Sequence, residues 1–600
     1  MPLATDLLSL PFSQNLKILK GIFQVPEKIR VQFQEPIYQC LVAVSPIPLL
    51  ESDKDSANVF FSQQKLGHPE AFRILCTENK ITVDSSTPQG GLFALHAISQ
   101  ILKHGKTEIP CFEVNDRPIL KRRGFMLDVS RCKVPTMETI FNLIDLLSIL
   151  RINELQLYIE HTYAFENHRT VWNESSPLTG SEIQKIDQYC RDRFIQLVPN
   201  LNSFGHFERW LRHEPYKKLA ECPKGFHRDE PYMVRDHGSV LKPDQESLKF
   251  IDSLYEEYLP NFSSEKFNVG LDEPWELGQG WSKPEVGKRG KHSVYLDHLK
   301  GILSLVENRG KSMEFWADVL LEKPDKAKDL PKSASPVIWG YEANHPFDEQ
   351  ARTIAACGLK YSLAPGTATW RSFSGRWKTA RANLISATQN SQKHEAEGIL
   401  LTSWGDCGNH QPWATLYPPL VLGAQLAWSG QDATDTEIGD FIDHTIFDAP
   451  CSGLGKSFIK LAKLDQHTGF NLPNNSLPWF ALFSAQPEKL PEHLSEHVTV
   501  MDLKRGLDWM KEIENINFMF ENNRNADFAK QEWRLGIELS KLGLKHALSL
   551  MGERQIIGQP ESHASLIEKF QDIWLLRARE GGLQEASNLL KQALDQTLFS

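Results

Sequence analysis

The chain has 600 residues, of which 41% are hydrophobic and 24% charged, and its formal net charge is −10 at pH 7. This composition is ordinary for a soluble globular protein, and the length predicts about three or four domains, fewer if one is a barrel. The charges are spread along the sequence, which argues against a nucleic-acid partner because that would need a concentrated basic patch. Uncharged substrates such as sugars remain open.

The cysteines and the start of the chain bear on its compartment. The nine cysteines are scattered and form no CxxC pair, which predicts reduced thiols rather than a disulfide framework or a zinc site. Residues 1–12 lack a basic start and an uninterrupted apolar core, and no later stretch is apolar over a membrane-spanning length. We therefore expect a cytoplasmic protein without a membrane partner, although a leader removed earlier would leave the same sequence.

Residues 1–118 predict a small N-terminal α/β domain. Phe72–Cys76 and Lys80–Asp84 are short apolar runs around a turn, which is typical of a β-hairpin. Pro88–Gly91 is expected to break the chain, and Leu92–Lys103 has apolar residues at helical spacing. A turn at residues 115–118 marks the predicted domain boundary.

Residues 119–430 alternate short apolar runs with helical segments. Such alternation predicts βαβ units and a parallel sheet, and eight units close naturally into a (β/α)8 TIM barrel. The longest insertion, which includes Cys222–Pro243, is polar and is expected to be a loop. The eight runs are Gly124–Val129, Glu154–Ile159, Gln196–Asn200, Phe267–Asp272, Met313–Asp318, Pro336–Trp339, Lys360–Ala364 and Ile399–Trp404.

Residues 431–600 lose the strand signals. Ala526–Leu550 places apolar residues along one face, and the segments around Leu566–Trp574 and Leu583–Leu594 do the same. Amphipathic segments of this kind predict a C-terminal α-helical domain. The predicted fold class is therefore α/β, with a TIM barrel between an α/β domain and a helical domain.

Two adjacent acids, Asp272 and Glu273, end the fourth apolar run. Like charges this close resist joint ionisation, so their pKa values tend to separate. One protonated and one ionised carboxyl is a combination that acid–base chemistry uses. By themselves the two acids are equally well explained as a solvated strand end.

Polar residues and tryptophans gather at the ends of the other runs, where a TIM barrel has its active site. Tryptophan faces pack on sugar rings, while carboxylates and amides bind hydroxyls; no glycine-rich phosphate cradle is present. A sugar is therefore the favoured ligand. The rim residues are Arg123, Asp128, Arg131, Glu160, His161, Tyr163, Asn200, Asn202, His206, Trp316, Asp318, Trp339, Tyr341, Trp404, Asp406, Asn409, His410 and Trp413.

Plainer interpretations stand beside this one. Trp316 and Trp339 would also fit the barrel core, His161 and His206 would fit as buried histidines, and Asp128 with Arg131 would fit as a structural ion pair. A metal site is disfavoured because no HExxH motif or other close ligand spacing occurs. We expect no metal and no cofactor.

Four segments of the barrel region resemble family 20 glycoside hydrolases, the β-N-acetylhexosaminidases. Arg123–Arg131 is similar to their first strand, Val198–His206 to their third and Asn268–Glu273 to their catalytic Asp-Glu strand. Trp404–Asp406 is similar to their eighth strand, and Pro88–Phe93 to a turn of the domain that precedes their barrel. The resemblance spans about residues 60–430, with the motifs in the right order.

The resemblance implies an exo-acting enzyme that releases terminal β-linked GlcNAc or GalNAc with retention. In this family the 2-acetamido group of the substrate attacks the anomeric carbon, in place of a protein nucleophile. Glu273 would be the general acid and base, and Asp272 would hold the acetamido N–H. The other residues implied to contact an oligosaccharide substrate are Arg123, His161, Asn202, His206, Trp316, Trp339, Trp404 and Asp406.

The chain also departs from the family pattern. Glu160–His161 stands where a His-x-His segment is usual, and Asn202 stands where an acid is common. The end of the seventh run lacks the expected tyrosine, for which Tyr163, Trp370 or Tyr341 would substitute. The resemblance therefore leaves open the GlcNAc or GalNAc preference, a GalNAc-specific branch, and the oligomeric state. Alternatives of another class are a non-catalytic carbohydrate-binding relative and a metal-dependent hydrolase.

Overall fold

The computed structural model describes residues 10–11, 15–105, 107–229, 232–450, 452–519, 523–553 and 560–597. The interpretation of residues 1–12 as lacking a leader falls almost wholly outside the described residues, and so does Cys451. The eight described cysteines form no disulfide. Of the helices in the described ranges, none combines the length and apolar character needed to cross a membrane.

The N-terminal sheet has seven strands in the order β1-β7-β5-β6-β4-β2-β3. The predicted hairpin is confirmed, because β5 and β6 pair antiparallel. The break expected at Pro88–Gly91 is wrong: these residues are the first turn of α2 (Pro88–Gly105), a place where proline fits a helix well. The other elements are β1 (Asn15–Gln24), β2 (Ile29–Phe33), η2 (Pro36–Tyr38), α1 (Leu41–Val44), β3 (Leu49–Glu51), β4 (Val59–Gln63), β5 (Phe72–Cys76), β6 (Ile81–Ser85) and β7 (Glu108–Asp116).

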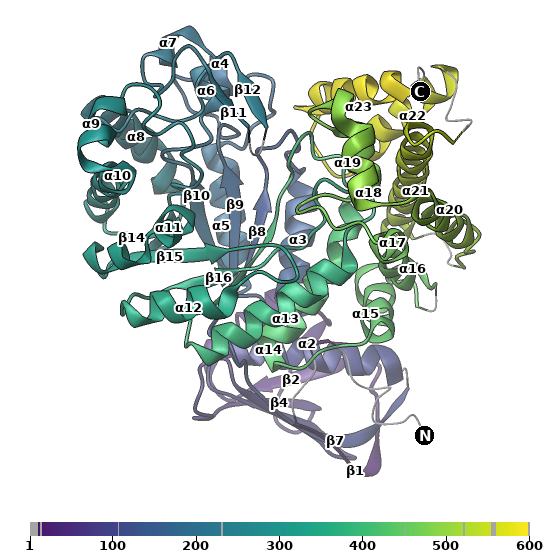
Figure 1. Cartoon of the computed structure of the whole chain (residues 1–600). Coiled ribbons are helices and arrows are strands. Elements are labelled where there is room, and N and C mark those ends of the chain that lie inside the picture. The colour runs from purple at the N-terminus through teal and green to yellow at the C-terminus, as the bar shows by residue number, and fades with distance from the viewer. Residues whose placement is uncertain are drawn as a thin grey trace.

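The (β/α)8 barrel is confirmed, and each predicted apolar run overlaps one of its strands. The strands are parallel, and the barrel closes where β17 pairs with β8. Figure 1 shows the strands beneath the surrounding helices, with the N-terminal sheet below them. The strands are β8 (Arg122–Asp128), β9 (Glu154–Ile159), β10 (Gln196–Leu201), β13 (Lys266–Asn268), β14 (Ser312–Trp316), β15 (Ala334–Trp339), β16 (Ser362–Ala364) and β17 (Gly398–Ser403).

Helices and short insertions connect the strands. The segment Cys222–Pro243, expected to be a loop, contains an antiparallel hairpin of β11 (Phe226–Arg228) and β12 (Met233–Arg235). Three-residue strands are too short to give a sequence pattern. The connecting helices are α3 (Met137–Ile149), α4 (Arg169–Trp172), α5 (Gly180–Asp192), α6 (Glu208–Leu211), α7 (Glu214–Lys217), α8 (Gln245–Tyr258), η3 (Leu259–Asn261), α9 (Lys283–Arg289), α10 (Lys291–Glu307), α11 (Asp318–Glu322), η4 (Pro324–Asp329), α12 (Phe347–Ala356), α13 (Trp377–Lys393), η5 (Trp413–Leu416) and α14 (Tyr417–Ser429).

A charged cluster fills the amino-terminal end of the barrel. Arg122 donates to Glu154 and to Glu314 Oε2 at 2.8 Å, and Lys266 Nζ lies 3.2 Å from Glu154 Oε2 and 3.7 Å from Glu314 Oε1. Arg122, Glu154 and Lys266 are the first residues of their strands, which places them at one end of the barrel. The two cations and two anions of this basal cluster balance one another.

The C-terminal helices pack against the opposite end of the barrel, and the predicted helical domain is confirmed. Arg209 Nη2 lies 2.6 Å from Glu585 Oε1, and Arg579 Nη2 lies 2.8 Å from Glu182 Oε1. These pairs tie the helices to the side of the barrel where the strands end. The elements are α15 (Asp435–Phe441), the π-helix η6 (Ile442–Ile446), α16 (Leu454–Leu461), α17 (Leu464–Thr468), α18 (Leu477–Phe483), η7 (Pro487–Lys489), α19 (Leu490–His497), α20 (Val500–Glu514), α21 (Arg524–Leu550), α22 (Pro560–Leu575) and α23 (Leu583–Thr597).

Candidate active site

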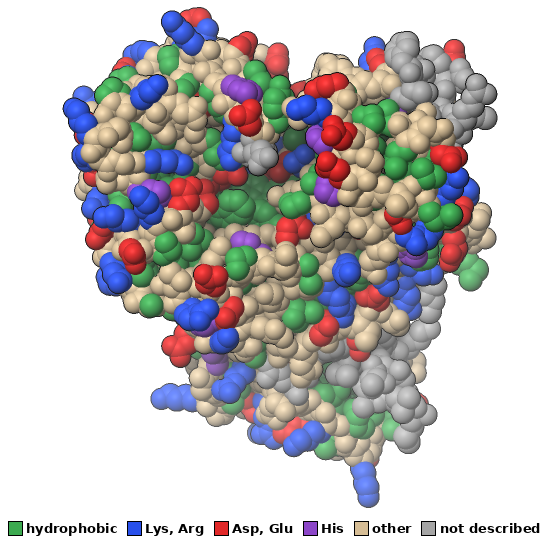
Figure 2. All heavy atoms as spheres, viewed as in Figure 1, with side chains coloured by type: hydrophobic (Ala, Val, Ile, Leu, Met, Phe, Trp, Pro, Cys, Tyr) green, Lys and Arg blue, Asp and Glu red, His purple; other side chains and the backbone are tan. Residues whose placement is uncertain are grey.

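The carboxyl ends of the barrel strands open into a hollow between two lobes (Figure 2). One lobe carries the β11–β12 hairpin, and the other is formed by the C-terminal helices (Figure 1). An apolar floor surrounded by polar groups is typical of a small-molecule site. The floor is an aromatic cluster inside the barrel: Tyr158, Trp316, Tyr341, Trp370 and Trp404, with Trp339 packed against it.

Asp272 and Glu273 stand on a loop with an unusual backbone. Gly270, Leu271 and Glu273 have φ angles of +70°, +70° and +50°. Asn202 Oδ1 accepts a hydrogen bond from the Leu271 N–H at 3.3 Å, and a Cβ on Gly270 would collide with the same side chain. Left-handed backbone costs energy in residues other than glycine and collects at functional sites. The loop lets both acids reach one histidine, although neighbours in a regular strand point to opposite faces.

That histidine is His206, which lies between the acids. Its Nε2 is 3.2 Å from Asp272 Oδ2 and 3.6 Å from Glu273 Oε2, while its Nδ1 is 3.7 Å from Glu160 Oε1. Burial disfavours the charged ring, but Asp272 and Glu160 outweigh it and raise the pKa of His206 to about 10. The imidazole is therefore protonated at neutral pH.

The two adjacent carboxyls differ in acidity. Burial opposes ionisation of Asp272, but His206 and the amide of Asn202, 3.1 Å from Asp272 Oδ1, hold the pKa of Asp272 below its ordinary value. Burial raises the pKa of Glu273 to about 7 against the attraction of His206, and repulsion by Asp272 and Asp406 adds to the rise. Near neutral pH an ionised Asp272 therefore neighbours a partly protonated Glu273.

Asp318 supports this loop from the end of the fifth strand. Its Oδ2 accepts a hydrogen bond from the Glu273 N–H at 2.9 Å, and its Oδ1 accepts one from Trp339 Nε1 at 3.5 Å. Burial and the charge of Asp272 raise the pKa of Asp318 to about 8. The sequence placed Asp318 on the rim without a role, and its role is to hold the backbone of Glu273.

Arg131 is the arginine that the hollow contains at the end of β8. Its Nη1 is 3.0 Å from Asp128 Oδ2, and its Nη2 is 3.0 Å from Glu160 Oε1. The guanidinium lies 4.7 Å from the ring centre of Tyr158 and 5.1 Å from that of Trp404. The ion pair foreseen between Asp128 and Arg131 is thus present, but 18% of the arginine side chain stays accessible, so it also borders the ligand space.

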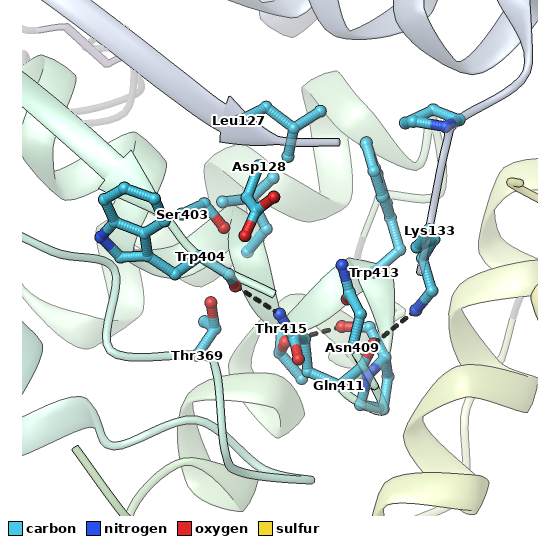
Figure 3. Close-up of a pocket in the computed structure, with 13 residues that line it drawn as sticks. Leu127, Asp128, Lys133, Thr369, Ser403, Trp404, Asn409, Gln411, Trp413 and Thr415 are labelled. Atoms are coloured by element: carbon cyan, nitrogen blue, oxygen red, sulfur yellow. Dashed lines mark hydrogen bonds between the residues drawn. The ribbon is translucent and has the colours of Figure 1, made fainter. Parts of the chain in front are cut away.

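Asp128 links the ends of the first and eighth strands. Its Oδ2 accepts a hydrogen bond from the Gly405 N–H at 2.9 Å, and its Oδ1 accepts one from the Ser130 N–H at 2.8 Å. Behind Asp128 and Trp404 lies a cavity of about 30 Å³, bordered by Lys133 and other residues of the two strand ends (Figure 3). This volume suits about one water molecule and is too small for a sugar, so the cavity backs the site.

The tryptophans and tyrosines form the floor together. Trp404 Nε1 donates to the Tyr341 hydroxyl at 2.8 Å, and Trp339 stacks on Tyr341 with ring centres 5.3 Å apart. Trp316 is only 1% exposed, so it lies in the barrel core beneath the ligand space. Of the three substitutes considered for the missing tyrosine, Tyr341 and Trp370 belong to this cluster.

Asp406 lies on the rim beyond Trp404 and is partly exposed. Burial raises its pKa, Arg131 opposes the rise and Asp128 adds to it, while Arg371 lowers it. Asp406 is thus close to both arginines. The structure brings Asp406 to the same end of the barrel as Asp272, Glu273, Asn202, His206, Trp339 and Trp404, with Trp316 beneath them in the barrel core, and their contacts with substrate stay predictions.

Arg123 is not part of this site, and its predicted contact with substrate is wrong. The guanidinium is fully buried at the amino-terminal end of the barrel, where Nη1 and Nη2 donate to the two carboxylate oxygens of Glu70 at 2.8 and 2.7 Å. Its Nε donates to the Arg151 carbonyl at 2.8 Å. Arg123 is the second residue of β8 and Arg131 follows the end of that strand, so the arginine of the hollow is Arg131.

The prediction that His161 faces the ligand is also wrong. Its ring is buried beside Cys132, Arg209 and Glu585, behind the strand ends and against α23. Tyr158 faces the inside of the barrel, so by strand alternation Glu160 follows it inward and His161 points away. That alternation is the signal that would have selected Glu160.

The arrangement can supply a proton from Glu273 while Asp272 remains ionised, and it can bind hydroxyls with Arg131 and Asp406. No group of three or more His, Cys, Asp or Glu side chains suited to a metal ion occurs among the described residues. The carboxyls, the histidine and the arginine of the hollow can supply general acid–base and electrostatic catalysis.

Comparisons with known proteins agree on one family. The model of "Glycosyl hydrolase family 20, catalytic domain" matches residues 121–431. The β subunit of β-hexosaminidase from Felis catus is 24% identical over 393 residues, which are 61% of this chain and 70% of that protein. Hexosaminidase D from Homo sapiens is 21% identical and covers 47% of this chain and 60% of its own length.

Two solved structures show the same fold. An exo β-N-acetylglucosaminidase from Vibrio harveyi, solved with N-acetylglucosamine, superposes with a TM-score of 0.59 at 18% identity, over 72% of this chain and 75% of that one. A chitobiase from Flavobacterium johnsoniae gives 0.59 at 16% identity, over 95% of this chain and 97% of that one.

Proposed function

The chain belongs to glycosyl hydrolase family 20 and is a glycoside hydrolase, and on that premise we propose that it removes terminal β-linked 2-acetamido sugars as an exo-acting β-N-acetylhexosaminidase. The observation that carries the proposal is the adjacent pair of an ionised Asp272 and a Glu273 whose pKa is about 7, both beside His206. The proposed substrate is an oligosaccharide ending in β-GlcNAc or β-GalNAc.

The first proposed step forms a bicyclic intermediate. The carbonyl oxygen of the 2-acetamido group attacks the anomeric carbon, the bond to the leaving oxygen breaks, and Glu273 gives that oxygen its proton. Ionised Asp272 accepts a hydrogen bond from the acetamido N–H and stabilises the positive charge that develops on the oxazolinium ion. Asn202 and protonated His206 hold Asp272 in this state.

The second step regenerates the enzyme. Glu273, now ionised, takes a proton from water, whose oxygen attacks the anomeric carbon as the oxazolinium ring opens. Two displacements at one carbon retain the β configuration. Asp318, which accepts a hydrogen bond from the Glu273 N–H, keeps the carboxyl in place through both steps.

Sugar binding is proposed for the remaining groups of the hollow. Arg131 and Asp406 would bind ring hydroxyls, while Trp404, Trp339 and Tyr341 would enclose the ring and the acetamido group. Tyr341 fits the place of the missing seventh-strand tyrosine because its hydroxyl is already positioned by Trp404 Nε1 at 2.8 Å. GlcNAc and GalNAc are epimers at C4, so the preference for one of them depends on how the site contacts the O4 hydroxyl.

The test uses 4-nitrophenyl β-glycosides of GlcNAc, GalNAc and glucose. We expect hydrolysis of at least one 2-acetamido substrate, no measurable hydrolysis of the glucoside, and inhibition by a thiazoline mimic of the intermediate. Glu273→Gln should lower kcat/KM by about 10²- to 10⁴-fold, the usual contribution of a general acid–base group. Comparing the first two substrates also settles the preferred sugar.

Glu285→Gln on the exposed helix α9 is the matched control and should leave kcat/KM unchanged. Cleavage of the glucoside at a comparable rate would contradict the requirement for a 2-acetamido group. Binding of the thiazoline without turnover of either 2-acetamido substrate would instead favour a non-catalytic sugar-binding relative.

A further inference from the structure

A second pocket, of about 180 Å³, lies apart from the sugar-binding hollow, between the barrel and the C-terminal helices. Its walls come from α3, from η5 and the start of α14, from the π-helix η6 and from the first turn of α21. The volume has room for about six water molecules, so it can hold a small ligand. π-Helices are rare and are frequent at functional sites.

Arg577 borders this pocket with a guanidinium that is only partly paired. Its carbonyl accepts a hydrogen bond from the Thr136 N–H at 3.0 Å, which fixes this segment to the start of α3. Its Nε donates to Glu532 Oε1 at 3.2 Å, but Nη2 has no hydrogen-bond partner among the described residues, although Arg577 is only 7% exposed. Burial raises the pKa of Tyr417 and the charge of Arg577 opposes the rise, which places the guanidinium near the tyrosine of the pocket wall. A buried donor without a partner is costly, and a ligand in the pocket would supply one.

The charges around Arg577 do not balance. Burial raises the pKa of Glu532, while both Arg577 and Lys133 favour its ionised form. Two cations thus share one carboxylate, and this group carries an excess positive charge. Asp145 also lines the pocket, but its carboxylate is already engaged by Arg193 Nε at 2.5 Å. An anion in the pocket would therefore compensate a buried cation.

The first turn of α21 adds a second group that favours an anion. Asn525, the second residue of this long helix, lines the pocket. The first N–H groups of a helix have no partner within it, and its N-terminus attracts negative charge. The guanidinium carbons of Arg524 and Arg577 lie 5.1 and 5.2 Å from the ring centre of Phe528, so Arg577 approaches this turn.

We propose that this pocket binds a small metabolite carrying an oxyanion, a phosphate or a carboxylate, through Arg577 and the first turn of α21. A planar guanidinium suits both groups because it can donate two parallel hydrogen bonds. Tyr417 and Asn142 of the pocket wall can bind the polar remainder of the ligand. The bound ligand joins α3 of the barrel to α21 and so stabilises the docking of the helical domain. The site is separate from the hollow, and the inference does not rest on the proposed glycosidase activity.

The test measures binding to the full chain by titration calorimetry, without turnover. The probes are glycerol 3-phosphate, glycerate and glycerol, which share a three-carbon skeleton and differ in the anionic group. We expect one molecule of at least one anion to bind per chain and to raise the thermal midpoint, because it binds only the folded state. Glycerol should do neither, and the anion that binds identifies the source of the oxyanion. Failure of both anions to bind would overturn the proposal.

Variants of the pocket decide where the anion binds. Arg577→Gln should weaken binding at least about tenfold, the effect of losing a hydrogen bond to a charged group. Since Arg577→Gln also leaves Glu532 without this partner and can unfold the chain, Asn142→Asp is the second variant. Asn142 is exposed on the pocket wall, so Asn142→Asp keeps the side-chain size and adds a repelling charge.

Asn308→Asp is the matched control, since it adds the same charge at an exposed position after α10, outside the pocket. It should bind the anion as tightly as wild type does. Unchanged affinity in Asn142→Asp and in folded Arg577→Gln would place the anion elsewhere and overturn the proposal. Equal losses in Asn142→Asp and Asn308→Asp would overturn it too, because binding would then depend on the overall charge of the protein.

Discussion

Both ends of the barrel bury charged side chains, but only one end balances them. In the basal cluster, Arg122 and Lys266 face Glu154 and Glu314, and these contacts lower the pKa of Glu154 to about 2. At the opposite end carboxyls outnumber their cationic partners, and burial raises the pKa values of Glu160 and Glu273 to about 7 and that of Asp318 to about 8.

The contrast shows where this fold stores reactivity. A matched set of buried charges stabilises ionised forms and makes breaking any pair costly. An excess of carboxyls leaves protons that can move near neutral pH, which a hydrolase needs.

Two arginines, Arg123 in the first strand and Arg131 just after it, give the sharpest test of this division. Arg131→Gln should lower kcat/KM of the folded enzyme by at least about 100-fold, because it removes a cation from the ligand space. The thermal midpoint should also fall, because Asp128 and Glu160 lose their shared cationic partner. Arg123→Gln should lower the free energy of unfolding by about 3 kcal/mol, because it leaves the buried carboxylate of Glu70 unpaired, while the folded fraction keeps its kcat/KM. Steady-state kinetics and calorimetry on both variants check the pair. A loss of kcat/KM in folded Arg123→Gln would return that residue to the site.

Substitution of two glutamates should change the stability of the fold in opposite directions. Glu154→Gln should lower the thermal midpoint at pH 8, because the ionised pair stabilises the fold above the unfolded-state pKa near 4.5 and is lost only as pH falls towards 2. Glu273 has a folded pKa of about 7, so the folded state holds a proton that the unfolded state releases near 4.5, and stability falls as pH rises between these values.

Glu273→Gln should therefore raise the free energy of unfolding at pH 8 by about 3 kcal/mol, and this gain should vanish towards pH 4.5. Calorimetric scans of wild type and both variants at pH 8 and pH 5 measure the difference. A stabilising Glu154→Gln, or a destabilising Glu273→Gln at pH 8, would remove the contrast between the two ends.

The pH profile of kcat/KM gives the smallest expected effect. Since Glu273 must be protonated in the first step, kcat/KM should decline above about pH 7, by about tenfold per pH unit at high pH. On the acid side, kcat/KM should be maintained to a pH below 3.8, the ordinary pKa of an aspartate, because the pKa of Asp272 is lowered. Initial rates from pH 3 to 9 on a 4-nitrophenyl β-glycoside test this. If kcat/KM does not decline by pH 9, Glu273 is not the titrating acid.

The barrel could be predicted from the sequence because its strands are buried on both faces and read as apolar runs. All eight runs overlap strands, including Phe267–Asp272, although β13 itself ends at Asn268. The shortened strand could not be foreseen, since it depends on the contact of Leu271 N–H with Asn202, which is distant in sequence. The β11–β12 hairpin was missed for another reason, because its three-residue strands are too short to give a sequence pattern.

The placement of Asp272 and Glu273 at the site end of the barrel could be predicted from their position after a strand. The prediction failed where the direction of a side chain decides whether the residue faces the hollow. Arg123 was taken for the rim arginine although it lies near the start of β8, and His161 was taken in place of its inward neighbour Glu160. Asp318 depends on contacts with Glu273 and Trp339 from neighbouring strand ends, and no pattern within one strand reveals them.

The hydrogen bond from the Gly405 N–H to Asp128 Oδ2, at 2.9 Å, has a consequence for folding. It lies at the junction of β8 and β17, which begin at residues 122 and 398 and are the first and last barrel strands to be synthesised. Until β17 leaves the ribosome, β8 is an edge strand without this partner, and contacts so distant in sequence form slowly. Because Asp128 also positions Arg131 at 3.0 Å, a nascent chain gains its complete catalytic centre only when the barrel closes. The time at which enzymatic activity appears during translation therefore reports when the barrel closes.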